Sequence, residues 1–392
     1  MLSKIEQGIH DRLAACISIT LVDVIEPNPK LLNKYINFVS TSFDDAQGMK
    51  TALEGVDTVF HLAAVGMTGQ YARDRKACMD INAVGTMNLL TWAKHAGVRR
   101  FIYTSSIGVI FTGKPLKDAT ELTPYPDTYC NFYCESKAQA ERIVVKASTQ
   151  EMRTTVLRFN GIYGPGEKRV TERVVKFMRS GLWIGLCKPK GQEAITQLSS
   201  VANCVQGLVK AELTLRMEDS PHGQIYNIMD AEACGTFTFW SPLHRALGFK
   251  NEMYDIPEYL LRWLARMSQN IADFLQIDPF VSMLEIDLLL ISSTFSTKKA
   301  SHELGYQPYP SSMPEIVEMY SIFLSYIASS DVHSNDVSSS YVSSRDVHYN
   351  NVSSSDVSSS DVSSSDVHPS DVHSSDIHSS DIHSSDVSSN DV

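Results

Sequence analysis

Short β-rich runs alternate with helical stretches along the first half of the chain, and this alternation constrains the fold most. The runs are "ITLVDV", "YINFVST", "DTVFHLAA", "RRFIYTSS" and "RTTVLRFN". This pattern predicts a parallel, doubly wound α/β sheet. "DTVFHLAA" is almost continuously apolar, so we expect it to be buried on both faces. We expect helices near Ala46–Leu53, Lys76–His95 and Tyr133–Ala147, with Gly97 closing the second.

The sequence pattern divides the chain into three parts. Residues 1–165 carry the alternating pattern and are expected to form a nucleotide-binding domain. Beyond Val170 the pattern is more helical, with a strand at Gly223–Met229, which predicts a smaller substrate lobe over residues 166–328. Residues 329–392 repeat S-S-x-D-V, a period that fits neither strand nor helix, and one Val or Ile per unit cannot form a core. We expect this tail to be disordered.

Charge and composition narrow the class of partner. The net charge is −11, but the tail with its 11 Asp and one Arg carries −10, so the remainder is nearly neutral. This gives no electrostatic basis for nucleic acid binding. Seven scattered cysteines indicate reduced thiols, and the six tail histidines leave weak metal binding as a lesser alternative. No stretch reaches the roughly 18–20 apolar residues of a membrane span. We expect a soluble, cytoplasmic protein, with peripheral membrane association left open.

The strongest chemical signal is "YCESK". It places Tyr133 and Lys137 one helical turn apart, so both side chains leave the same face. A tyrosine transfers protons poorly near neutral pH because its pKa is about 10, and a neighbouring ammonium favours the phenolate. Alone, Y-x-x-x-K occurs by chance on many helices, where it is a solvated lysine beside a half-buried tyrosine.

Polar residues elsewhere in the sequence support a catalytic role for Tyr133 and Lys137. "FIYTSSIGVIF" places Ser105 and Ser106 at the carboxyl end of a predicted parallel strand, the edge at which doubly wound sheets bind ligands. A serine there could bond a carbonyl oxygen while Tyr133 supplies or removes the proton. "HLAAVG" reaches the same edge with small residues that admit a flat cofactor. His61, its first residue, is more often a satisfied core histidine, and Asn82 is an amide that must find buried partners.

Five segments together resemble the extended short-chain dehydrogenase/reductases. They are "HLAA", "NAVGTMNLL", "FIYTSS", Y-x-x-x-K and "IYGPGEKR", in this order and spacing. "GMTGQYARDR" and "STFSTKKASHELGYQP" are similar to the 3β-hydroxysteroid dehydrogenase-like branch, and the resemblance runs from Ile17 to Tyr326. It implies a Rossmann-like fold and hydride transfer between a nicotinamide cofactor and a secondary alcohol or ketone, with a sterol-like substrate. It also implies a homodimer through the two long helices, and the branch adds the endoplasmic reticulum membrane as a location.

The resemblance assigns the catalytic roles. Tyr133 would be the general acid/base, and Lys137 would hold the nicotinamide ribose and lower the pKa of the tyrosine. Ser106 would orient the substrate oxygen, with Ser105 as the alternative. Asn82 would support the site and its proton relay.

The resemblance also assigns the cofactor contacts. Asp23, which ends the strand "ITLVD", would bind the adenosine ribose hydroxyls. An acid there repels a 2′-phosphate and so favours NAD over NADP. The other expected cofactor contacts are Ser42, Phe43, Leu62, Ala63, Ala64, Asn82, Tyr133, Lys137, Asn160 and Ile162.

The glycine-rich loop of the family pattern is not found in the residues before Asp23. The family has a T-G-x-x-G-x-x-G loop there, whose backbone amides hold the pyrophosphate, whereas here only Gly8 precedes Asp23. We therefore expect the chain to start within or just after the first helix, without the first strand. The alternative function is a catalytically inactive Rossmann-like scaffold that binds a partner or ligand. A structural role of the repeat tail ranks last.

Overall fold

The structure is a computed structural model. It describes residues 18–27, 29, 32, 35–67, 70–167, 169–180, 193–249, 257–275, 277 and 279–330. The expectations for the start of the chain and for the S-S-x-D-V tail concern residues 1–17 and 331–392, which lie outside the described residues.

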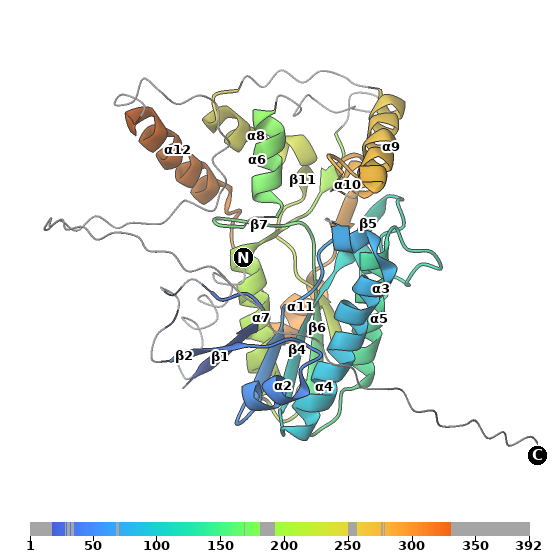
Figure 1. The fold of residues 1–392 in the computed structure, drawn as a ribbon, viewed down its shortest axis with the longest axis vertical. Helices are drawn as coiled ribbons and strands as arrows, with labels where there is room; N and C mark the ends of the chain where they lie inside the picture. The colour runs from blue at the N-terminus through green and yellow to red at the C-terminus, as the bar shows by residue number, and fades with distance from the viewer. Residues whose placement is uncertain are drawn as a thin grey trace, which may run out of the picture. The chain divides into compact units, whose positions relative to one another are not determined.

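A parallel four-stranded sheet carries the expected nucleotide-binding fold, in the order β10-β6-β4-β3. Figure 1 labels its two middle strands, β4 and β6. Tyr103 of β4 lies opposite His61 of β3 and opposite Val156 of β6, so the carboxyl ends of these strands lie at one edge. The parallel sheet and its helical crossovers confirm the predicted α/β, Rossmann-like class. The strands are β3 (Thr58–His61), β4 (Arg100–Ser106), β6 (Arg153–Phe159) and β10 (Gln224–Asn227).

Two further strands form a separate parallel pair, β1 (Ile19–Asp23) with β2 (Ile36–Ser40). Val22 packs against the same core cluster as Phe101 of β4. Within the described residues no ladder joins β1 to β3, and no strand lies between them. A doubly wound sheet has its strands in the spatial order 3-2-1-4-5-6. Here β2 and β1 correspond to strands 3 and 2 of that order, and β3, β4 and β6 correspond to strands 4, 5 and 6. No described strand corresponds to strand 1.

Helices cover both faces of the four-stranded sheet. Phe101 and Tyr103 pack in one cluster with α2, α4 and α5, whereas Ile102 between them packs with α7 and α11 on the other side. This alternation follows the two-residue period of a strand. The helices are α2 (Ala46–Ala52), α4 (Gly85–His95), α5 (Phe132–Lys146), α7 (Val201–Leu215) and α11 (Lys298–Leu304).

Two expectations about this region need correction. The single helix expected over Lys76–His95 is divided by a π-helical turn, η3 (Met79–Val84), between α3 (Arg75–Cys78) and α4. Gly97, at φ +77°, follows this helix as expected. The strand in "DTVFHLAA" is not buried on both faces: β3 is partly buried over its first three residues, because it is the outer strand of its sheet among the described residues.

The later part of the chain is mainly helical, as predicted, and its short strands join β5 and β7 of the earlier part in two small sheets. One has the order β11-β8-β12-β5, and the other pairs β7 with β9. The strands are β5 (Leu116–Ala119), β7 (Ile162–Tyr163), β8 (Ile195–Thr196), β9 (Ser199–Ser200), β11 (Cys234–Gly235) and β12 (Ser293–Phe295). The helices are α6 (Thr171–Arg179), α8 (Thr236–Ala246), α9 (Glu258–Leu275), α10 (Met283–Leu290) and α12 (Met313–Ser330). Short 3₁₀ turns are η2 (Gln70–Arg73) and η4 (Ile107–Val109).

Candidate active site

Lys137 is held at the carboxyl end of β4. Asn131 caps α5, since its side-chain oxygen accepts from the Cys134 amide at 2.9 Å. The Lys137 ammonium donates to the carbonyl oxygen of Thr104 at 2.5 Å and lies 4.3 Å from the centre of the Tyr103 ring. Only 3% of Lys137 is exposed. Burial lowers its pKa to about 7, and the negative charge of Glu141 opposes that shift.

Tyr133 lies against Ser106. Burial raises the pKa of Tyr133 to about 12 and the neighbouring Cys134 adds to the rise, whereas a hydrogen bond with Ser106 and the charge of Arg169 lower it. The pKa of Tyr133 is raised and not lowered overall, so the sequence-based expectation that Lys137 brings it down stays a prediction. In this geometry the phenol keeps its proton at neutral pH.

The structure distinguishes between the two candidate serines. Ser106 contacts Tyr133, and its hydroxyl oxygen accepts from the Gly108 amide at 3.1 Å. Ser105 lies in register with Arg158 of β6, is 5% exposed, and has a hydroxyl without a hydrogen-bond partner. Of the pair, Ser106 is therefore the one that the fold brings to the tyrosine.

Asn82 connects the π-helical turn to α5. Its amide nitrogen donates to the Ser136 hydroxyl at 2.9 Å and to the Val65 carbonyl at 3.4 Å, and its oxygen accepts from the Val65 amide at 2.8 Å. Ser136 in turn donates to the carbonyl oxygen of Tyr133 at 2.9 Å. Asn82 is thus satisfied in the core, as a buried amide must be, and it holds the loop after β3 beside the tyrosine.

The loop after β3 carries the expected cofactor residues Leu62, Ala63 and Ala64, which are partly buried. The guanidinium of Arg169 lies against this loop, since a Cβ on Gly66 would fall 2.6 Å from its Nη1. The preceding His61 is 3% exposed, with Nε2 2.8 Å from the Thr86 hydroxyl. Burial and the charge of Lys137 lower its pKa to about 3, so His61 is the core histidine that was expected.

The adenosine end of the expected cofactor site is less complete. Asp23 is half-buried at the end of β1, where its carboxylate accepts from the Ile25 amide at 3.1 Å. The Ser42 hydroxyl donates to Asp44. Phe43 packs edge-on against His61, with 5.4 Å between ring centres, and belongs to the core. Asp23 can therefore meet a ribose, whereas Phe43 lies among core side chains.

Two further expected cofactor residues lie just beyond β6. The Asn160 amide group donates to the Gln197 carbonyl at 2.7 Å, and the Asn160 backbone N–H donates to the Ser199 hydroxyl at 3.0 Å. Ile162 packs against the cluster formed with α7. The Asn160 side chain is thus committed to the protein, and a cofactor would meet the backbone of this segment.

Sequence reasoning missed Glu141 and Arg169 as polar neighbours of the site. Glu141 follows Lys137 by four residues in "YCESKAQAE", so helical spacing could have found it. Arg169 comes from the turn before α6, and no local pattern links it to α5. Among the described residues, no group of three or more His, Cys, Asp or Glu is placed to hold a metal ion.

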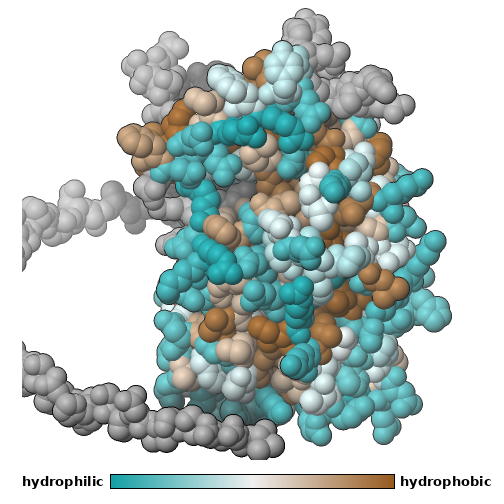
Figure 2. All heavy atoms as spheres, turned by 90° about the vertical axis from the view of Figure 1, so that its right-hand side faces the viewer, coloured by the Kyte–Doolittle hydropathy of each residue, from teal (hydrophilic) through white to brown (hydrophobic). Residues whose placement is uncertain are grey.

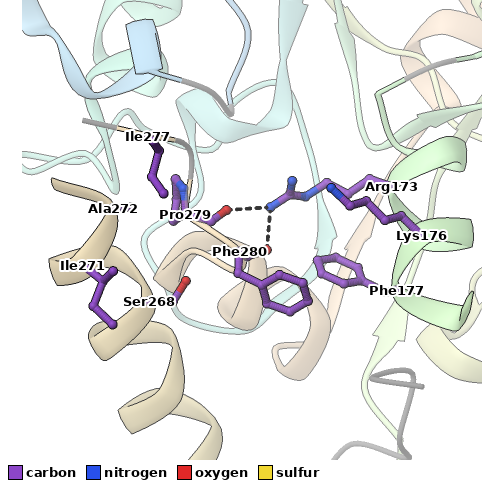
Figure 3. A pocket seen from close by; sticks show the side chains of 9 residues that line it. All are labelled: Arg173, Lys176, Phe177, Ser268, Ile271, Ala272, Ile277, Pro279 and Phe280. Atoms are coloured by element: carbon purple, nitrogen blue, oxygen red, sulfur yellow. Dashed lines mark hydrogen bonds between the residues drawn. The ribbon is translucent and has the colours of Figure 1, made fainter. Parts of the chain in front are cut away.

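A cavity of about 510 Å³ lies apart from these residues, between α6 and α9 (Figure 3). Arg173, Lys176 and Phe177 approach it from α6, and α9 supplies Ile271 to the opposite wall. Arg173 is engaged by Glu285 and by the backbone carbonyl of Phe280, at 3.0 Å. None of the expected catalytic or cofactor residues lines this cavity.

The fold and the Ser106–Tyr133–Lys137 arrangement define an extended short-chain dehydrogenase/reductase. The family model of the 3-beta hydroxysteroid dehydrogenase/isomerase family matches residues 16–257, and this chain belongs to that family. Members of the family are oxidoreductases that act on CH–OH groups, so the predicted enzyme class is confirmed.

Individual relatives agree with this assignment. The chain is 65% identical, over 318 residues, to 3beta-hydroxysteroid dehydrogenase/Delta(5)-Delta(4) isomerase 1 of Caenorhabditis elegans, covering 81% of this chain and 69% of the relative. It is 29% identical to human short-chain dehydrogenase/reductase family 42E member 1, over 80% of this chain and 82% of that protein.

Solved structures agree on the fold. The dTDP-glucose 4,6-dehydratase DesIV of Streptomyces venezuelae, solved with NAD, has a TM-score of 0.62 at 19% identity and covers 82% of this chain and 95% of its own. The UDP-glucose 4-epimerase of Thermotoga maritima has a TM-score of 0.60 at 19% identity and covers 83% and 96%.

Proposed function

We propose that this chain is an NAD-dependent dehydrogenase that interconverts a secondary alcohol and a ketone on a sterol-like substrate. The observation that carries the proposal is the placement of Tyr133 against Ser106, with Lys137 one turn along the same helix and bound to the carbonyl of Thr104, at the carboxyl edge of a parallel sheet. The sterol class follows from the name of the C. elegans relative, to which the chain is 65% identical.

The described residues fit a nicotinamide dinucleotide at two points. Asp23 at the end of β1 can accept hydrogen bonds from ribose hydroxyls, and its charge disfavours a 2′-phosphate, so NAD is preferred to NADP. The half-buried Ala63 and Ala64 leave the loop after β3 open to a flat ring. Within the described residues no glycine-rich turn leads from a strand into a helix at the β1 edge.

The chain's own residues then perform the proton chemistry. A bound nicotinamide cofactor would supply the hydride acceptor for oxidation or the hydride donor for reduction at the substrate carbon. The Ser106 hydroxyl holds the substrate oxygen, and Tyr133 gives a proton to that oxygen during ketone reduction or takes it during alcohol oxidation. Lys137, fixed to Thr104, places a positive charge beside the reacting groups whenever it is protonated. Asn82 holds the loop after β3 against the start of α5.

Peripheral membrane binding is the second part of the proposal. No described helix is long and apolar enough to cross a bilayer. However, α9 exposes a continuous apolar stripe, and Figure 2 shows apolar side chains at the surface on the face turned toward its viewer. Such a helix binds the membrane interface through its apolar face. The stripe consists of Leu260, Trp263, Leu264, Met267, Ile271 and Phe274.

Dimerisation is the third part of the proposal. Ile81, Val84 and Met87 are exposed at a spacing of three residues along η3 and α4. This spacing places them along one side of the helix, in line with the expected contact through the long helices. We propose that two copies pair there in the cytoplasm, or on the endoplasmic reticulum membrane where α9 is bound. Light scattering should give the dimer mass, and a monomer at all concentrations would exclude this part.

The experiment that tests the cofactor is a titration with NADH, followed by its fluorescence and by the melting temperature. We expect a dissociation constant below about 100 µM and measurable stabilisation in excess ligand. Tyr133→Phe should bind NADH about as well as the unmodified chain. An unchanged melting temperature at millimolar NADH would instead favour the inactive scaffold.

A further inference from the structure

A fully buried ion pair lies one helical turn beyond Lys137. Glu141 and Arg158 are both 0% exposed. The Nε of Arg158 lies 3.2 Å from each carboxylate oxygen of Glu141, and the Nη2 of Arg158 donates to the Oε1 of Glu141 at 2.5 Å. The hydroxyl of Tyr125 donates to the same Oε1 at 2.6 Å. Removing two charges from water is costly, and a buried pair often stabilises a protein less than apolar residues would. Stability alone is therefore a weak reason for this pair.

The hydrogen bonding around Arg158 also argues against a purely structural role. Arg158 lies in register between Ser105 of β4 and Asn227 of β10, so the three share one level of the sheet. Arg158 Nη1, Ser105 Oγ and Asn227 Oδ1 are all buried without a hydrogen-bond partner. An arrangement selected for stability alone would not leave three such groups unsatisfied on one level.

The position of the Glu141–Arg158 pair indicates that Glu141 acts on Lys137. Tyr133, Lys137 and Glu141 follow one another at four-residue intervals on α5 and form a single stripe of side chains. The other groups around the ammonium carry no negative charge at neutral pH: His61 from β3, Tyr103 and the Thr104 carbonyl from β4, and Tyr133 from α5. Glu141 is the anion that acts on Lys137 among the described residues.

We propose that Glu141, anchored by Arg158 and Tyr125, is a positioning residue that supplies the buried negative charge holding the Lys137 ammonium in its charged form. Arg158 ties the carboxylate to the sheet, so Glu141 acts on Lys137 through its field while bonded elsewhere. This inference rests on the proposed function, because it concerns the cation beside the proposed proton donor. It goes further by assigning a task to two residues outside the Ser–Tyr–Lys set.

The test measures the ionisation of Lys137 without cofactor or substrate. The free energy of unfolding in urea is followed from pH 6 to 9 for the unmodified chain, Glu141→Gln and Arg158→Met, each with and without Lys137→Met. For each protein, the difference between the forms with and without Lys137→Met gives the contribution of Lys137 to the free energy of unfolding. Folded Lys137 loses its proton near pH 7 and unfolded lysine near 10.5, so its contribution to stability rises with pH above a midpoint near 7.

The two substitutions should shift this midpoint in opposite directions. Glu141→Gln removes the favourable charge and should lower the midpoint by about one unit or more, whereas Arg158→Met leaves Glu141 free to act on Lys137 and should raise it. Should Glu141→Gln not fold, the neutral double variant Glu141→Gln/Arg158→Met should still lower the midpoint. A common direction, or an unmoved midpoint in variants that fold, would overturn the proposal. Failure to bind NADH would leave this measurement intact, so the two proposals fail separately.

Discussion

The side-chain amide of Asn82 donates to the hydroxyl of Ser136 at 2.9 Å and thereby joins the π-helical turn η3 to helix α5. The same amide group meets both the N–H and the carbonyl of Val65. One residue therefore holds three segments together around Tyr133: the loop after β3, the π-helical turn and the start of α5.

Replacing Asn82 by alanine should destabilise the fold and impair the site. It removes these bonds and leaves the Val65 N–H without its acceptor, which should lower the free energy of unfolding by about 2–3 kcal/mol. Urea unfolding measures this loss. Asn88→Ala is the matched control, because the amide of Asn88 makes a single long contact, 3.5 Å, with the Phe43 carbonyl. Equal losses in both variants would contradict the role given to Asn82.

Alcohol oxidation should accelerate with pH. Oxidation needs the phenolate of Tyr133 to take the substrate proton, and the pKa of Tyr133 is raised to about 12 by burial. The phenolate fraction then rises about tenfold per pH unit below that value, and kcat/KM reports the free enzyme. We expect kcat/KM for oxidation to climb between pH 7 and 9, whereas ketone reduction stays nearly constant. A plateau of oxidation from pH 7 onward would show that the phenol ionises far more readily.

His61 should make the fold sensitive to acid. Its pKa is lowered to about 3 in the folded chain, against about 6.5 when unfolded, so the unfolded state binds more protons between these values. Stability should therefore fall as pH drops below 6.5, and at pH 4.5 His61 alone accounts for about 2.5 kcal/mol of the loss. Measured by urea unfolding at pH 7 and 4.5, His61→Gln should lose correspondingly less. The same acid sensitivity in both proteins would rule out His61 as its source.

The exposed stripe on α9 should govern binding to vesicles. Phe274 is 86% exposed and Trp263 is 55% exposed. Each aromatic ring moved from water into the interface contributes about 1.5–3 kcal/mol at most, so Trp263→Ser with Phe274→Ser should weaken binding to phosphatidylcholine–phosphatidylserine vesicles by tenfold or more. Leu122→Ser is the control, since Leu122 is 91% exposed and is not part of α9. Equal sedimentation of all three proteins with vesicles would refute the membrane face.

The sequence predicted what local patterns and strand order can specify. Alternating β-rich and helical runs located the four strands of the central sheet, and the shared carboxyl edge brought Ser106 to Tyr133. Helical spacing placed Lys137 on the same face as Tyr133. These features depend on residues close in sequence or on the general geometry of parallel sheets.

Features set by tertiary contact could not be predicted in the same way. The bond from Lys137 to the Thr104 carbonyl depends on how closely α5 approaches β4. The π-helical turn contains Asn82, whose hydrogen-bond partners lie on two other segments. The Glu141–Arg158 pair joins a helix to a strand, and no sequence motif links the two positions.

Proton transfer by Tyr133 is tested by NADH formation from NAD and a 3β-hydroxysteroid, followed at 340 nm. We expect the unmodified chain to form NADH, and Tyr133→Phe to lower the rate by about 100-fold or more while its affinity for NADH changes little. Equal turnover by Tyr133→Phe, or an unmodified chain that binds NADH without oxidising the steroid, would rule out the proposed function.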